Sequence, residues 1–298
     1  MIDFKPLDLN NKAAYDHFLF PTGHKGCEYN FASLFLWGRQ QAAFLGDNLV
    51  FFSQFNRKSV YLFPVCHENF KTTMDAIIED AAQRGIPCCL TNMSHSDCAM
   101  LEGHYPGMFR FHHDRDSFDY IYDIEELSQL KGRKFQKKRN HLNKFKLLHS
   151  GYTVEPITQD NILQVQQLLD DWYAAREDQD AFCMERVAIQ KALQYRETLG
   201  MEGITLTYKG QILAMTLASP LTIDTYDIHF EKAIDESAYV AINYEFARYL
   251  KEKHPQIQWL NREDDLGLEG LRRAKLSYNP HHLIEKHWAM LLEDGYDY

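Results

Sequence analysis

The sequence predicts an α/β (α+β) protein of two tandem units, each with a mixed, mostly antiparallel sheet. Two observations predict this class. The second half of the 298-residue chain runs through two helices, a strand hairpin, a strand, a helix, a strand, a helix and a strand. The first half follows a similar order more faintly. We expect a first domain over residues 1–127 and a second over residues 128–298, each long enough to bury a core.

Hydrophobic periodicity and turn residues predict the elements of the second half. Two helices are expected in NILQVQQLLDDWYAAR and in MERVAIQKALQYRETLG, which ends at Gly200. GITLTYKGQILAMTLASP predicts a hairpin that turns at Lys209-Gly210, and TIDTYDIHFEKA predicts a third strand. A helix in AYVAINYEFARYLKEKH, a short strand in IQWL, a helix in LEGLRRAKLSY and a final strand in HHLIEKHWAML complete the unit. The first and third of these helices have apolar faces, formed by Ile162, Val165, Leu169, Trp172 and Tyr173, and by Ile242, Phe246, Tyr249 and Leu250.

The first half contains the same kinds of element. AAYDHFLF predicts a helix, and NLVFFSQFNRKSVYLFPV predicts a hairpin that turns at Asn56-Arg57. A helix follows in ENFKTTMDAIIEDAAQRG and ends at Gly85. IPCCLTNMS predicts a buried strand, SDCAMLEGHY a short helix, and MFRFHHDRDSFDYIYDI one or two further strands.

Composition excludes several classes of protein. No apolar run approaches the roughly 18 residues of a membrane span, and the start MIDFKPLDLNNK carries acids where a signal peptide is basic and then apolar. We therefore expect a cytoplasmic protein. The six cysteines are irregularly spaced, which argues against a disulfide framework. A zinc site from Cys88, Cys89, His95 and Cys98 lacks paired CxxC spacing, so we expect core cysteines, no metal and no cofactor.

A basic segment over residues 131–149 stands out in a chain whose formal net charge is −10. Eight Lys or Arg lie between Lys131 and Lys146, and residues 127–152 contain no Asp or Glu. Phe135, Leu142, Phe145 and Leu148 recur at helical spacing, so part of the segment is expected to be an amphipathic helix. A solvated helix face is the simplest interpretation, but like charges at this spacing repel unless an anion neutralises them.

The missing acids favour an anionic ligand for this segment. Phosphates of a nucleic acid or of a phosphorylated cofactor are preferred, and an anionic membrane surface is the alternative. The residues expected to bind are Arg133, Lys134, Lys137, Lys138, Arg139 and Asn140.

A second polar group follows the predicted buried strand that ends at Leu260. In WLNREDDLGLEGLRRAKLSYNP, residues 261–265 place an amide, a guanidinium and three carboxylates before the next helix. Loops beyond the carboxyl ends of strands are common ligand sites in α/β sheets. Capping of the helix by Asp264 or Asp265 is the alternative for one carboxylate. The site residues expected here are Asn261, Glu263, Asp265, Arg272, Lys275 and Tyr278.

Two more polar residues are expected near this end of the sheet. Glu231 follows the strand DIHF directly, and Asn243 shares the inward side of the following helix with Ile242 and Phe246. A core Asn bonded to backbone is the alternative for Asn243.

Three stretches together resemble one known family. They are GRKFQKKRNHLNKF, HFEKAIDESAYVAINYEFA and NREDDLGLEGLRRAKLSYNP, and the N-terminal GCEYNFASLFLW extends the likeness over nearly the whole chain. They resemble the family related to the C-terminal domain of phosphatidylglycerol lysyltransferase. Its members have tandem domains similar to the Gcn5-related N-acyltransferase fold, whose order of elements matches the second half here. They are also similar to the bacterial enzymes that build peptidoglycan cross-bridges from aminoacyl-tRNA.

The resemblance implies an aminoacyl transferase. It implies transfer of an aminoacyl group from aminoacyl-tRNA to an amine or hydroxyl acceptor, with the basic segment holding tRNA phosphates. Such a reaction needs positioning, a proton acceptor and stabilisation of an oxyanion. On this hypothesis Glu263 or Asp265 binds the aminoacyl ammonium or removes a proton, with Glu231 nearby. Arg272 and Lys275 bind phosphate or developing negative charge, and Tyr278 donates a proton to the leaving oxygen.

Two departures from known patterns keep other functions open. The lipid-modifying members carry a membrane-embedded half, which this sequence lacks, and that puts a lipid acceptor in question. Acyl-CoA enzymes of this fold use a glycine-containing turn to hold pyrophosphate, whereas EKAIDESAYVAIN has no glycine. An acyl-CoA-dependent N-acyltransferase is therefore the second hypothesis. A non-catalytic protein that binds anions or nucleic acid is the third.

Overall fold

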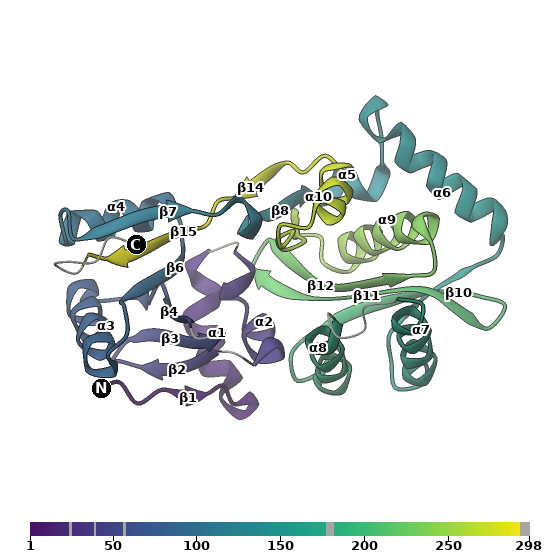
Figure 1. The fold of residues 1–298 in the computed structure, drawn as a ribbon. Helices are drawn as coiled ribbons and strands as arrows, with labels where there is room; N and C mark the ends of the chain where they lie inside the picture. Colours follow the sequence, from purple (N-terminus) through teal and green to yellow (C-terminus); the bar gives the residue numbers. More distant parts are fainter. Residues whose placement is uncertain (24–25, 39, 56–57, 177–181, 293–298) are drawn as a thin grey trace. The chain divides into compact units, whose positions relative to one another are not determined.

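The computed structural model describes residues 1–23, 26–38, 40–55, 58–176 and 182–292, and these residues form two compact units (Figure 1). Unit 1 contains residues 1–119, 264–267 and 284–298, and unit 2 contains residues 120–263 and 268–283. The units are thus assembled from separated stretches of chain, whereas the sequence analysis divides the chain between residues 127 and 128. Within the described residues, no helix is both long and apolar enough to cross a bilayer.

Unit 1 is built on a mixed sheet with strand order β1-β2-β3-β4-β6-β15-β7, and β5 also pairs with β3. Its neighbours are antiparallel except for β4 and β6, which are parallel. The strands are β1 (Lys5–Pro6), β2 (Gln40–Phe44), β3 (Asn48–Phe55), β4 (Lys58–Leu62), β5 (Val65–Cys66), β6 (Cys89–Met93), β7 (Phe109–His113) and β15 (His287–Leu291). The helices are α1 (Lys12–Leu19), α2 (Phe31–Trp37), α3 (Phe70–Arg84) and α4 (His95–His104). The turn predicted at residues 56–57 lies outside the described residues.

Unit 2 is built on a second mixed sheet, with strand order β14-β8-β13-β12-β11-β10-β9. Its strands are β8 (Asp119–Asp123), β9 (Thr153–Pro156), β10 (Glu202–Tyr208), β11 (Gln211–Thr222), β12 (Thr225–Ala233), β13 (Trp259–Asn261) and β14 (His282–Ile284). Its helices are α5 (Ile124–Gln129), α6 (Gln136–Leu148), α7 (Ile162–Ala174), α8 (Cys183–Tyr195), α9 (Glu236–Lys253) and α10 (Glu269–Leu276). In Figure 1, α9 covers one face of this sheet and α7 and α8 cover the other.

The helix faces of unit 2 follow the predicted pattern. On α7, Val165, Leu169 and Tyr173 are buried, and on α9, Phe246 and Leu250 are buried. Burial of these stripes against the sheet stabilises each helix more than its intrinsic propensity does. The predicted mixed α/β fold class is confirmed.

The predicted final strand over residues 281–291 is wrong as a single element. It is two strands, β14 in the second sheet and β15 in the first. The break falls at Lys286, whose fully buried ammonium lies 2.7 Å from Asp119 Oδ1 and 2.6 Å from Glu28 Oε1. A buried lysine needs such partners, so the chain turns here to meet these carboxylates. The stretch 108–124 divides in the same way, because β7 belongs to the first sheet and β8 to the second.

Candidate functional site

The candidate site lies in unit 2, where the parallel strands β12 and β13 diverge. They pair only from Thr225 with Trp259 to Asp227 with Asn261, and β12 then continues to Ala233 without this neighbour. Beyond the last pair, polar side chains come from both sides of the opening. They are His229 and Glu231 on β12, and Arg262 and Glu263 directly after β13.

Arg262 and Glu231 form a buried ion pair across this divergence. Arg262 Nη2 donates to Glu231 Oε2, and the two side chains are 11% and 12% exposed. Burial by itself lowers the pKa of Arg262, but the Glu231 carboxylate outweighs this and holds the pKa above its usual value. Among the described residues, Arg262 Nε and Nη1 and Glu231 Oε1 have no hydrogen-bond partner. Buried polar atoms left without partners are uncommon. Here the two Arg262 nitrogens can donate to a polar ligand, and the Glu231 oxygen can accept from it.

Tyr278 joins this ion pair to the basic helix α6. The Lys138 ammonium lies 3.6 Å from the centre of the Tyr278 ring, and the Arg262 guanidinium lies 4.9 Å from it. Burial, reinforced by the positive charge of Arg262, lowers the pKa of Lys138 to about 8. Burial also raises the pKa of Tyr278 well above its usual value, so its hydroxyl stays protonated at neutral pH.

Glu263 is held by contacts to its backbone and to its side chain. Asn261 Oδ1 accepts from the Glu263 amide at 2.7 Å, and Lys275 Nζ donates to the carbonyls of Arg262 and Glu263. Glu263 has a φ of 54°, an uncommon backbone conformation that these bonds help to maintain. Its Oε1 lies 3.1 Å from Nδ1 of His229. The segment after β13 is therefore fixed in place and not a loose loop.

His229 sits at the centre of a buried polar row. Its Nε2 is 2.8 Å from Ser219 Oγ, and its Nδ1 is 3.1 Å from Glu263 Oε1 and 3.7 Å from Asp227 Oδ2. Ligand atoms of Asp227, His229 and Glu263 all lie within 4.8 Å of one another, a spacing that suits a metal ion. Because both imidazole nitrogens already have hydrogen-bonding neighbours, we assign the row to positioning of the Glu263 carboxylate.

The structure brings several of the predicted site residues together, and the others form contacts outside this group. Glu231, Glu263, Lys138 and Tyr278 belong to the site in unit 2. The ammonium of Lys275 is buried under the 262–263 backbone. Asn243 Nδ2 donates to the Tyr239 carbonyl at 2.8 Å, and its Oδ1 has no partner among the described residues.

Asp265 has a different environment from Glu263. It is fully buried in unit 1, where it accepts from the Gly267 amide at 3.0 Å and lies 3.5 Å from Arg115. Its carboxylate thus closes the turn that precedes α10, which begins at Glu269. Arg272 on α10 is half-buried.

The basic segment forms a short 3₁₀ turn followed by α6, with Phe135, Leu142 and Phe145 buried as predicted. Leu148 is 54% exposed, so its predicted inward position is wrong; it is the last residue of the helix, beyond the packed turns. The side chains of Arg133, Lys134, Lys137 and Asn140 are exposed.

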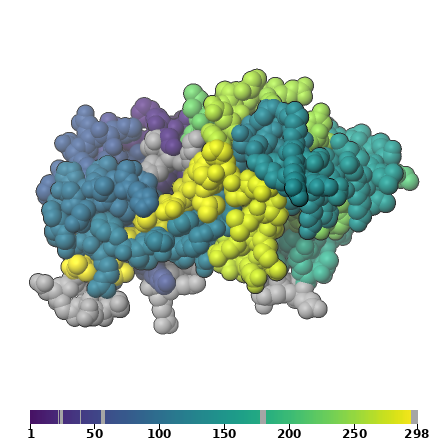
Figure 2. Space-filling model, turned by 90° about the horizontal axis from the view of Figure 1, so that it is seen from above, coloured from purple at the N-terminus to yellow at the C-terminus, as the bar shows by residue number. Residues whose placement is uncertain are grey.

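Two cations of the segment contact the protein itself. Lys134 pairs with Glu126 at 2.6 Å, and Arg139 donates to the carbonyls of Leu130 and Gly132. The residues after α10 lie against this segment, because Asn279 Nδ2 donates to the Lys134 carbonyl at 3.4 Å; Figure 2 shows the corresponding yellow and teal surfaces side by side.

His229 and Asp227 were not recognised in the sequence, and neither was the distinct environment of Lys138. Arg262 was noted in the polar group after the strand but was not among the expected site residues. A signal for the first two was present in DIHFE, where Asp227, His229 and Glu231 occupy every second position of a buried strand. Side chains at alternate positions share one face of a strand, so three polar groups on such a face indicate a site.

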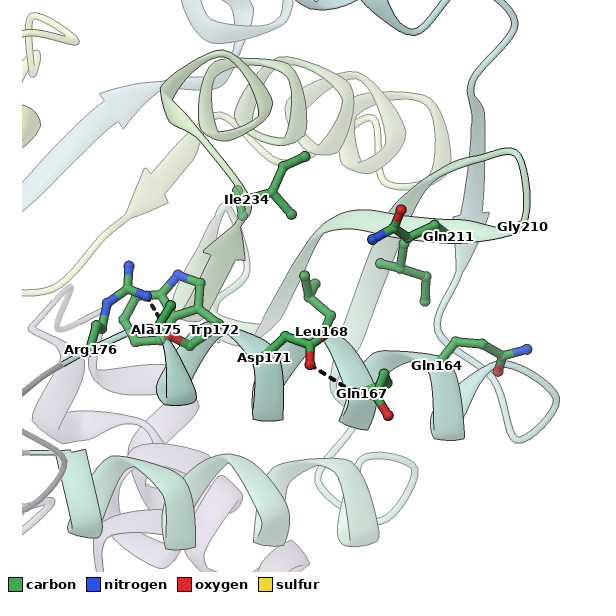
Figure 3. A pocket seen from close by; sticks show the side chains of 12 residues that line it. Gln164, Gln167, Leu168, Asp171, Trp172, Ala175, Arg176, Gly210, Gln211 and Ile234 are labelled. Atoms are coloured by element: carbon green, nitrogen blue, oxygen red, sulfur yellow. Dashed lines mark hydrogen bonds between the residues drawn. The ribbon is translucent and has the colours of Figure 1, made fainter.

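A hollow of about 400 Å³ lies beside α7, at the turn between β10 and β11 and the turn between β12 and α9. Figure 3 shows Trp172 and Arg176 at one end of it and Gln164 at the other. Two cations contact the Trp172 ring, with the Arg176 guanidinium 3.1 Å and the Lys232 ammonium 4.1 Å from its centre. None of the residues that line the hollow was predicted as a site residue; Trp172 was named only for a helix face and Gly210 only for a turn.

Two acids lie at the start of α9. Asp235 caps this helix by accepting from the Ala238 amide at 2.9 Å, and Glu236 adds a second acid in the first turn. Acids here stabilise the helix through its dipole, and they also oppose a phosphate at the same amides.

Comparisons with known proteins agree with the fold and with the resemblance. Residues 20–290 match the family described as phosphatidylglycerol lysyltransferase, C-terminal. A solved structure of a conserved protein of unknown function from Bacteroides thetaiotaomicron is 36% identical, with a TM-score of 0.92 over 98% of this chain and 100% of that one. The structure of L-PGS from Bacillus licheniformis is 16% identical, with a TM-score of 0.70 over 96% of this chain and 93% of that one.

Two further matches are more distant. A structure of FemX is 11% identical, with a TM-score of 0.58 over 98% of both chains, and it shares the fold. An uncharacterised protein of Mycoplasmoides gallisepticum is 24% identical over 177 residues, which are 59% of this chain and 57% of that protein. The match thus spans little more than half of the length of this curated relative. With the family match extending over most of its length, the chain belongs to the family of the phosphatidylglycerol lysyltransferase C-terminal domain.

Proposed function

We propose that this protein transfers an aminoacyl group from an aminoacyl-tRNA to an amine or hydroxyl acceptor. Its family and fold support a transferase of the aminoacyl kind. One observation carries the proposal further. Lys138 lies on the basic helix α6, and it contacts the same Tyr278 ring as Arg262, which is paired with Glu231. A basic surface and a buried polar site therefore meet at a single aromatic ring.

The exposed cations of α6 suit the phosphates of a tRNA. Arg133 in the preceding 3₁₀ turn and Lys137 in the first turn of α6 are exposed, with Asn140 in the next turn, whereas Lys134 is paired with Glu126. Binding of a polyanion at these positions releases counterions and relieves the repulsion among like charges. The acceptor end of the tRNA then lies near Lys138, where the basic surface gives way to the buried pair.

The chemistry requires one bond to form and one to break. The acceptor nitrogen or oxygen bonds to the ester carbonyl carbon, and the ribose oxygen of the tRNA leaves. In our proposal the unpaired Oε1 of Glu231 binds the aminoacyl ammonium. The unpaired Nε and Nη1 of Arg262 stabilise the oxyanion, because buried donors are strongest where charge develops.

Two groups are available for the proton transfers. Lys138, with a pKa near 8, accepts the proton of the attacking amine or hydroxyl when its own amine is neutral. Lys138 then passes this proton to the leaving ribose oxygen, while the Tyr278 hydroxyl donates a hydrogen bond to the same oxygen. His229 positions the Glu263 carboxylate, and we propose that Lys275 keeps the backbone of Glu263 in place, while Asp265 fixes the turn before α10.

Partners and location follow from the same hypothesis. We propose a bacterial, cytoplasmic enzyme, since charged tRNA is present in that compartment. The acceptor is a lipid headgroup, a peptide or a small molecule, and a lipid acceptor adds peripheral contact with an anionic membrane. Asp235 and Glu236 at the start of α9 disfavour acyl-CoA as the donor.

The test uses tRNA charged with labelled amino acids, offered with lipid vesicles, peptides or small amines as acceptors. We expect the protein to move label from tRNA to one acceptor class, and Arg262→Lys to slow this by at least about 100-fold. Lys209→Gln, on an exposed turn of unit 2, is the matched control and keeps full activity. Salt-sensitive tRNA binding without any transfer supports the non-catalytic alternative. A thermal shift with acyl-CoA and none with aminoacyl-tRNA overturns the proposal.

A further inference from the structure

Two histidines and a glutamate converge on the surface of unit 1, and none of them belongs to the candidate site in unit 2. His95 is the first residue of α4, Glu285 lies just before β15, and His287 is the first residue of β15. His95 Nε2 is 3.1 Å from Glu285 Oε2, and His287 Nε2 is 3.9 Å from the same oxygen. We propose that these three side chains bind one divalent transition-metal ion, with Zn²⁺ as the best-fitting ion.

The spacing of the ligand atoms fits such an ion. Zinc binds histidine nitrogen and carboxylate oxygen at about 2.0–2.2 Å, so two ligand atoms of a tetrahedral ion stand roughly 3.4 Å apart. The two distances from Glu285 Oε2 lie on either side of this value. All three ligand atoms lie within 4.8 Å of one another, so a small rotation of the exposed Glu285 side chain equalises the contacts.

An independent observation concerns His287. Its side chain is only 9% exposed, and its Nε2 has no hydrogen-bond partner among the described residues. Buried imidazole nitrogens are normally bonded, and a metal ion supplies the missing partner. An ordinary surface histidine would bond to water, but this nitrogen is buried. It lies in the same group as the His95 and Glu285 ligand atoms.

The donor set indicates the class of ion. Two imidazoles and one carboxylate suit Zn²⁺ and its neighbours Co²⁺ and Ni²⁺, whereas Ca²⁺ and Mg²⁺ prefer oxygen ligands alone. Three protein ligands leave the fourth position of a tetrahedral ion for water. A further imidazole, that of His113, lies close by, since His113 pairs with His287 across β7 and β15 and their ring centres are 5.6 Å apart.

A metal ion here fastens the C-terminal strand to the start of α4. His95 and Glu285 are 190 residues apart in sequence, so no local spacing reveals the site. In the sequence, His95 stands near Cys88, Cys89 and Cys98, and that spacing predicted no metal site.

The experiment is titration of the chelator-treated full chain, without an affinity tag, with ZnCl₂ by calorimetry. We expect one equivalent to bind with micromolar or tighter affinity and to raise the melting temperature. His95→Ala and Glu285→Gln, both at exposed positions, each weaken binding at least tenfold. His112→Ala removes an exposed histidine of β7 that pairs with Trp288 and not with His287, and it leaves binding unchanged.

A second measurement, Co²⁺ absorption, reports the geometry of the site directly and does not depend on the melting temperature of a variant. Co²⁺ gives visible absorption bands whose intensity reports a tetrahedral site, and His287→Ala is expected to abolish them. The proposal is overturned if Zn²⁺ does not bind. It is equally overturned if binding survives both His95→Ala and Glu285→Gln, since that result indicates adventitious surface binding only.

Discussion

The ammonium of Lys138 lies 3.6 Å from the centre of the Tyr278 ring, which places a cation of the basic helix α6 inside the polar cluster at the divergence of β12 and β13. The aromatic face attracts the cation and partly replaces its lost water. The contact is within unit 2, so it does not depend on how the two units are placed. It links the two sequence features, the basic segment and the polar strand end, through one pair of side chains.

Lys138→Met is expected to change the pH dependence of stability. Burial lowers the pKa of Lys138 to about 8, so the folded protein binds fewer protons than the unfolded chain between pH 8 and the usual lysine pKa near 10.4. The stability of the wild type therefore rises with pH across that window, and the cost of burying the cation is fully present below it. We expect Lys138→Met to gain stability relative to the wild type at pH 7 and to lose that advantage by pH 10.5, in urea denaturation. Equal pH slopes for both proteins would contradict a lowered pKa.

The ion pair between Arg262 and Glu231 is expected to be strongly coupled. Removal of one partner leaves a buried charge without compensation, which typically destabilises by about 3–5 kcal/mol. We expect Glu231→Ala to cost roughly 3 kcal/mol, and the double variant with Arg262→Ala to cost less than the sum of the single changes. A double-mutant cycle in urea measures this, and additive effects would show that the pair is not coupled.

The sequence was informative where periodicity and local turns decide the structure. The buried faces of α7 and α9 and the hairpin of β10 and β11 follow from patterns within single segments. The partners of strands are set by contacts far apart in the chain. For this reason β8 and β15 were not assigned to their sheets, although their hydrophobic patterns were visible.

The candidate site was also predicted only in part, because its members come from segments far apart in the chain. Glu263, Tyr278 and Glu231 stood out as polar residues next to strands or before a proline. Lys138 was grouped with five neighbours, because composition does not distinguish a lysine that turns inward from one that is solvated. Asp265 and Glu263 are two residues apart, but Glu263 has a left-handed backbone and their carboxylates bond to different partners.

Lys275→Met is expected to loosen the segment that carries Arg262 and Glu263. The ammonium of Lys275 donates to both of their carbonyls from a buried position, and hydrogen bonds to charged groups contribute about 1.5–3 kcal/mol. We expect a loss of roughly 2 kcal/mol in urea denaturation and lower transfer activity. Arg273→Ala on the same helix is the control, because its side chain is 74% exposed and its change should stay within about 0.5 kcal/mol. A Lys275 variant as stable as this control would remove the positioning role.

The exposed start of the basic segment is expected to set tRNA affinity but not the chemical step. Arg133→Gln and Lys137→Gln each remove one exposed cation. Each phosphate contact contributes about one unit to the slope of log affinity against log salt, so each change should reduce that slope by roughly one and weaken binding.

Filter binding at several salt concentrations, with Lys209→Gln as the control, measures the effect. Single-turnover transfer at saturating tRNA should stay within about threefold of the wild type, because these side chains are exposed and separate from the Arg262 pair. Unchanged salt slopes in both variants would place the tRNA phosphates elsewhere on the protein.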